Sequence, residues 1–81
     1  MNTAKLLRLP DVLVMTASTR STHYLRIQQR LMTPPVKLGE RCAAWPVSEV
    51  EAINAARIAG KTTDEIRELV ARLIDARTAQ V

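Results

Sequence analysis

The chain has 81 residues, of which 47% are apolar and 25% are charged. This length predicts a single domain, and the apolar fraction excludes wholesale disorder. The net charge of +4 comes from the first half: residues 1–45 hold seven basic and two acidic residues, and residues 46–81 hold five and six. Such segregation favours a face for a polyanion over chance solvation by lysine and arginine, which is the alternative interpretation.

Enzyme chemistry has little support in the sequence. Cys42 is the only cysteine, which excludes an intramolecular disulfide, and His23 is the only histidine. The chain contains no glycine-rich phosphate loop and no cluster with metal-ligand spacing, so we assign no catalytic, cofactor-binding or metal-binding residue. No signal peptide or transmembrane run is visible, which predicts a cytoplasmic protein without a membrane partner.

The first predicted elements are two short helices joined by a tight polar turn. Pro10 at a first helical position predicts a helix over residues 10–15. The segment TAST at 16–19 favours a turn, and Thr19 is the expected N-cap of a second helix that runs to about residue 30.

The second helix is expected to bury one stripe and expose the rest. The spacing of Tyr24, Ile27 and Leu31 predicts the buried stripe. Its solvent side is then expected to carry Arg20, His23, Arg26 and Arg30. Because Trp45 and Tyr24 are the only aromatic residues, both are expected to lie in a mostly aliphatic core.

A proline-led hairpin is predicted after the second helix. Pro34 and Pro35 cannot continue that helix, because they lack an amide donor and fix φ. Short strands are expected over 36–38 and 42–45, around a loop at 39–41 that contains a glycine.

Two further helices are predicted from capping signals. The segments SEVE at 48–51 and TTDE at 62–65 have capping-box spacing, and Gly60 is expected to end the first of these helices. The last helix, to about residue 77, presents one apolar stripe of Ile66, Leu69, Val70, Leu73 and Ile74. This stripe either packs on its own domain or forms the seam of a homodimer.

This order predicts a mainly α fold with a small β-hairpin, a winged helix-turn-helix. Residues 1–60 are the expected DNA-binding domain, and 61–81 a C-terminal amphipathic helix. Two short helices joined by a tight turn place the start of the second helix in the major groove of double-stranded DNA, and the hairpin is expected on the backbone or minor groove as a wing. The candidate DNA-binding residues are Arg20, Ser21, Thr22, His23, Arg26, Arg30, Lys37 and Arg41.

An ordered series of motifs carries a family resemblance over about residues 8–57: RLPDVL at 8–13, T-x-x-T-R-S-T-x-Y at 16–24, PPVKLGER at 34–41, Trp45, and SEVEA at 48–52. This series resembles the AlpA-type prophage regulatory proteins, small winged helix-turn-helix proteins related in fold to MerR-type domains and phage excisionases. Ala17 stands where that family commonly has glycine, and Arg30 stands where glycine often ends the recognition helix.

The resemblance implies transcriptional control of a prophage or integrase gene by a bacterial or phage-encoded, nucleoid-associated protein. It places Arg20, Ser21 and Thr22 at the start of the recognition helix, and Lys37 and Arg41 in the wing. Two alternatives remain open, an excisionase-like recombination directionality factor and a protein-interaction module that uses the helix over 62–77.

Overall fold

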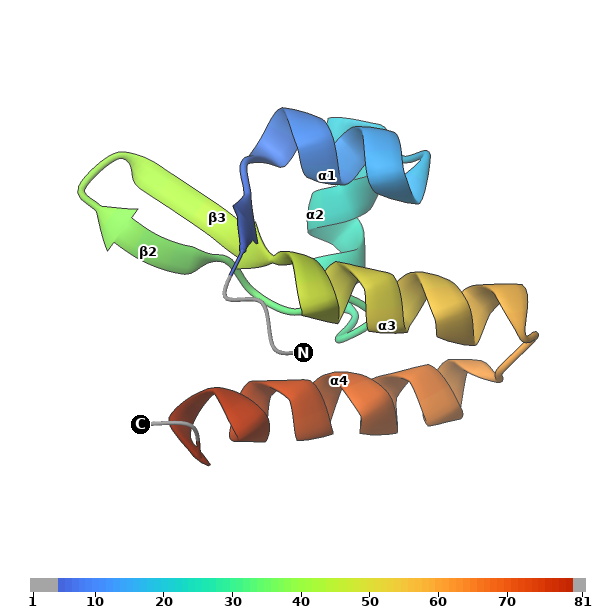
Figure 1. The fold of residues 1–81 in the computed structure, drawn as a ribbon. Coiled ribbons are helices and arrows are strands. Elements are labelled where there is room, and N and C mark those ends of the chain that lie inside the picture. Colours follow the sequence, from blue (N-terminus) through green and yellow to red (C-terminus); the bar gives the residue numbers. More distant parts are fainter. Residues whose placement is uncertain (1–4, 80–81) are drawn as a thin grey trace.

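The computed structural model describes residues 5–79, which form four helices and a three-stranded antiparallel sheet (Figure 1). The predicted mainly α fold with a small hairpin and a C-terminal helix is therefore confirmed, and the order of the elements is compatible with a winged helix-turn-helix. The elements in chain order are β1 (Leu6–Leu7), α1 (Leu9–Thr16), α2 (Arg20–Gln28), β2 (Val36–Gly39), β3 (Cys42–Pro46), α3 (Val47–Ile58) and α4 (Thr63–Ala79).

The sheet has one strand more than the predicted hairpin. Its order is β1-β3-β2, with Leu7 opposite Trp45 and Lys37 opposite Ala43. The β1 strand is only two residues long, too short for a period-two pattern to be recognised in the sequence. It fixes the chain just before α1 against the base of the hairpin, which projects away from the helices (Figure 1).

The turn between α1 and α2 is closed by backbone hydrogen bonds. Ala17 adopts a left-handed conformation with φ 53°, and the amides of Ala17 and Ser18 donate to the carbonyls of Val14 and Leu13. This pair of hydrogen bonds forms the Schellman motif, which usually has glycine at the left-handed position. The predicted cap of α2 is confirmed, because the Thr19 hydroxyl accepts a 3.1 Å hydrogen bond from the amide of Thr22.

A second Schellman motif ends α2 at Gln28, about two residues before the predicted end. Arg30 has φ 63°, and the amide of Leu31 donates to the carbonyl of Arg26 at 2.8 Å. A left-handed residue stops the helical hydrogen-bond ladder, so the helix ends here without help from Pro34.

The signals at the ends of α3 and α4 are mostly confirmed. Gly60 has φ 78° and closes α3, and the TTDE capping box forms with Thr62 and Glu65 exchanging hydrogen bonds of 2.8 and 3.1 Å. Ser48, however, is not the N-cap of α3. That helix begins at Val47 with Pro46 as its cap, because β3 runs directly into α3 and leaves no turn for a serine cap.

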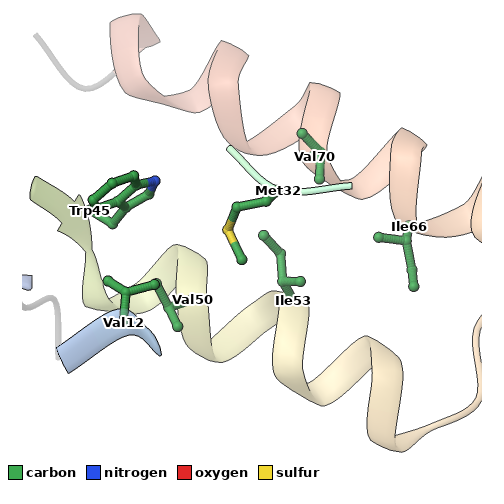
Figure 2. Close-up of a cluster of buried hydrophobic side chains, with 7 residues drawn as sticks. All are labelled: Val12, Met32, Trp45, Val50, Ile53, Ile66 and Val70. Carbon is green, nitrogen blue, oxygen red and sulfur yellow. The ribbon is translucent and has the colours of Figure 1, made fainter. Parts of the chain in front are cut away.

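The hydrophobic core lies between α1, β3, α3 and α4 (Figure 2). Its buried members are Val12, Met32, Trp45, Val50, Ile53, Ile66 and Val70. Ile66 and Val70 come from α4, which lies antiparallel to α3 (Figure 1). The prediction that Ile66 and Val70 form the seam of a homodimer is therefore wrong, since a seam needs side chains that are free to meet a second copy. Leu69 and Leu73 also pack against this core.

An ion pair fixes the carboxyl end of α4 to the start of α3. Arg77 donates to both carboxylate oxygens of Glu49, at 2.8 and 2.7 Å, and to the carbonyl of Pro34 at 2.8 Å. Glu49 is only 5% exposed, so Arg77 neutralises a carboxylate that would otherwise be buried alone.

Candidate nucleic-acid interface

The exposed side of α2, here called its outward face, differs from the predicted one by a rotation of the helix. It consists of Arg20, Ser21, Tyr24, Leu25 and Gln28. Tyr24 is 43% exposed and Leu25 is 50% exposed, so the expectation that Tyr24 belongs to the core is wrong. Ile27 and Leu31 do pack against the core.

His23 is fully buried, so the prediction that it faces solvent as a DNA-binding residue is wrong. Its ring stands edge-on to Trp45 with 4.8 Å between the ring centres, and a similar contact to Tyr24 measures 5.4 Å. Neither ring nitrogen has a hydrogen-bond partner within the described residues. Burial, assisted by the nearby charge of Arg26, lowers the pKa of His23 below its usual value of 6.5. A side chain with no exposed surface does not reach DNA, and we remove His23 from the candidate set.

Arg26 is held in the turn instead of projecting outward. Its guanidinium donates a 3.1 Å hydrogen bond to the hydroxyl of Ser18, which itself shares a 2.8 Å hydrogen bond with Thr16. Arg26 is half-buried. This contact ties the body of α2 to the turn that precedes it, so Arg26 has a structural role whether or not it also approaches a phosphate.

Arg30 is exposed and lines a groove to which Arg20 does not contribute. That groove, of about 400 Å³, lies between the end of α2 and α4, and Arg67 and Ile74 of α4 also line it. The structure thus separates Arg30 from the start of α2.

Two candidates lie on the hairpin. Arg41 occupies its turn, and Lys37 lies on β2, both exposed. Lys37 is paired with Ala43, and directly paired residues of neighbouring strands project from the same face of a sheet. Ala43 lines the groove described next, so Lys37 belongs to the side of the hairpin that faces this groove.

Three arginines from three parts of the chain meet at a groove of about 310 Å³ between α2 and the hairpin, here called the arginine groove. Arg8 comes from the junction of β1 and α1, Arg20 from the start of α2, and Arg41 from the hairpin turn. The remaining lining residues are Leu9, Pro10, Tyr24, Ala43 and Trp45. No acidic residue is among these lining residues, so the groove concentrates positive charge where two elements meet.

The prediction of the site missed Arg8, Tyr24 and Gln28. Arg8 directly precedes the start of α1, a position that the sequence indicates. The sequence does not indicate which residues lie near Arg8 in space. Tyr24 and Gln28 follow Arg20 at four-residue intervals, so the position of the cap at Thr19 would have placed them on one face with Arg20.

The described residues show neither a membrane-spanning helix nor a metal site. No helix in the part of the chain that the structure describes is long and apolar enough to cross a membrane. Across residues 5–79, no three histidine, cysteine or acidic side chains gather in a way that would hold a metal ion.

Two short helices joined by a tight turn and flanked by a hairpin, with arginines gathered between them, are compatible with a small winged helix-turn-helix protein. The comparisons then identify the family: residues 5–58 match the family described as prophage CP4-57 regulatory protein (AlpA), and the chain belongs to it. It is also 42% identical over 57 residues to the uncharacterized protein ORF88 of Enterobacteria phage P4. That match covers 70% of this chain and 65% of the phage protein. No solved structure matched.

Proposed function

We propose that this protein is a sequence-specific DNA-binding regulator of prophage or integrase genes. The outward face of α2 reads bases in the major groove, and the hairpin lies along the neighbouring backbone or minor groove. The observation that carries the proposal is the arginine groove, where the start of α2 and the hairpin turn present Arg20 and Arg41 to the same space. Membership of a prophage regulatory family supports the regulatory part of the proposal.

The residues of the outward face have the chemistry that base reading requires. An arginine pairs bidentately with guanine, a glutamine pairs with adenine, and serine accepts or donates to several base edges. Arg20, Gln28 and Ser21 supply these three groups on one exposed face. Leu25 adds an exposed apolar side chain, which suits the methyl group of thymine.

The first experiment is a selection of bound sequences from random duplex DNA, followed by affinity measurements on the selected duplex and on an unrelated duplex. We expect affinity to fall steeply with salt, because arginine and lysine release counterions from the backbone. Arg20→Ala is expected to weaken binding to the selected duplex about 5- to 100-fold while changing binding to the unrelated duplex much less.

The matched control is Arg72→Ala, which removes an exposed arginine on α4 and leaves the interface untouched. It is expected to keep the affinity for both duplexes. The proposal fails if no duplex is retained at low salt. It also fails if the combined loss of Arg20, Lys37 and Arg41 leaves binding unchanged.

A further inference from the structure

Arg8 is the lining residue of the arginine groove that belongs neither to the recognition helix nor to the hairpin. It is exposed and occupies the position just before the first residue of α1. Pairing of Leu7 with Trp45 fixes the backbone next to it, so the place of Arg8 beside the hairpin is set by the sheet. A long side chain held at its base in this way loses less freedom when it binds a ligand.

The three guanidinium groups of the groove have no partner among the residues that the structure describes. None of Arg8, Arg20 and Arg41 makes a side-chain hydrogen bond or ion pair in the described part of the chain. By contrast, Arg26, Arg67 and Arg77 are each bound to a carbonyl, a hydroxyl or a carboxylate. The arginines that build the fold and the arginines that face the groove are thus separate sets.

Other features of the groove also favour an anion. The amino-terminal end of α1 contributes Leu9 and Pro10 to the lining, so the positive end of that helix dipole adds to the three positive charges. Tyr24 lines the groove as well, and its phenol is a hydrogen-bond donor. Ala43 and buried Trp45 line the same space with apolar surface, which strengthens electrostatic attraction there.

We propose that Arg8 and Arg41 together bind one phosphodiester of the DNA backbone in the arginine groove, and that this phosphate fixes the register of α2 on the duplex while Arg20, at the same groove, remains free to read a base. The inference rests on the proposed function. Planar guanidinium groups bind phosphate oxygens bidentately, and a phosphate held by two of them couples the helix-turn-helix and the hairpin to one point of the backbone. Contacts of this kind position a protein on DNA, and base contacts then specify the sequence.

The test uses the selected duplex in a series of versions, each with one backbone phosphate replaced by an uncharged methylphosphonate. The wild-type protein is expected to lose about tenfold in affinity at one position of the series, because this replacement removes the charge that Arg8 and Arg41 share. Arg8→Ala is expected to lose a similar factor on the unmodified duplex, with a salt slope smaller by about 1. On the duplex with the methylphosphonate at that position, Arg8→Ala and the wild type are expected to bind equally.

Two further variants keep the result interpretable. Arg8→Lys retains the charge without the planar fork, so it is expected to restore the salt slope but only part of the affinity. Arg72→Ala is expected to respond to every methylphosphonate as the wild type does. Thermal unfolding of each variant is measured alongside, and Arg8→Lys decides the question if Arg8→Ala is unfolded.

The proposal is overturned if Arg8→Ala, or Arg8→Lys where it replaces it, keeps wild-type affinity and salt slope, or if every methylphosphonate affects the variant and the wild type alike. Failure of the wild-type protein to bind any duplex is a different outcome, which refutes the proposed function itself.

Discussion

The ion pair between Arg77 and Glu49 gives the sharpest prediction about stability. Arg77→Met keeps the length of the aliphatic stem but removes three hydrogen bonds, two to Glu49 and one to the carbonyl of Pro34. The side chain of Glu49 is 6% exposed, so the substitution leaves a nearly buried carboxylate without its partner. Loss of one partner from a buried pair costs about 3–5 kcal/mol.

The lower end of that range applies here. The side chain of Arg77 is 22% exposed, so water reaches the vacated position and solvates part of the carboxylate. We therefore expect Arg77→Met to lower the free energy of unfolding by about 3 kcal/mol. A domain of this size has about 4–12 kcal/mol of stability in total, so the melting temperature falls by about 12–24 °C.

Urea unfolding followed by fluorescence measures this loss, because Trp45 is the only tryptophan and is buried in the core. Glu49→Met completes a double-mutant cycle: in that background Arg77→Met is expected to cost less than about 1 kcal/mol, since no buried charge remains to be orphaned. Arg72→Met on the same helix is the control for the loss of an exposed arginine. A cost for Arg77→Met below about 1 kcal/mol, or an equal cost with and without Glu49, contradicts the reasoning.

Two other substitutions test the helix-turn-helix itself. Ala17→Gly is expected to raise the free energy of unfolding by about 0.5–1 kcal/mol in urea, because the left-handed conformation at Ala17 strains any side chain; a destabilised variant would contradict this explanation. Protonation of buried His23 is penalised in the folded state, so its folded pKa lies below its unfolded value near 6.5. Stability from this group is complete above about pH 6.5 and is lost as the pH falls toward the folded pKa. His23→Leu is expected to abolish that part of the loss of stability. The free energy of unfolding is measured for both proteins from pH 7 to pH 5, and an equal decrease in the two would show the explanation to be wrong.

Signals that depend on a few neighbouring residues predicted the local structure well. Thr19 caps α2, Thr62 and Glu65 form their capping box, and Gly60 closes α3, because each of these hydrogen bonds joins residues within one turn of a helix. Ser48 carries the same signal without forming a cap. Its failure comes from β3, which delivers the chain to α3 from a direction that leaves Pro46 at the cap position.

The rotation of α2 depended on residues far along the chain. A stripe of Tyr24, Ile27 and Leu31 and a stripe that includes His23 are both compatible with a helical period, and sequence alone did not decide between them. Trp45 decides, because it packs against the ring of His23 from a strand that the sequence places 22 positions away. The same limit explains Arg8, which becomes a groove residue only because β1 pairs with the end of β3.

The loop between α2 and the hairpin is held by arginines from the second half of the chain. The carbonyls of Gln29, Leu31 and Pro34 accept hydrogen bonds from Arg67, Arg57 and Arg77, respectively. Two of these three donors belong to α4, although the family match ends at residue 58. A chimera that transfers residues 5–58 to a new host therefore inherits α2 and the hairpin but only one of the three arginines, Arg57, that hold the loop between them. Such a graft has to bring its own helix, with two aliphatic residues for the vacated core and two arginines for the carbonyls of Gln29 and Pro34.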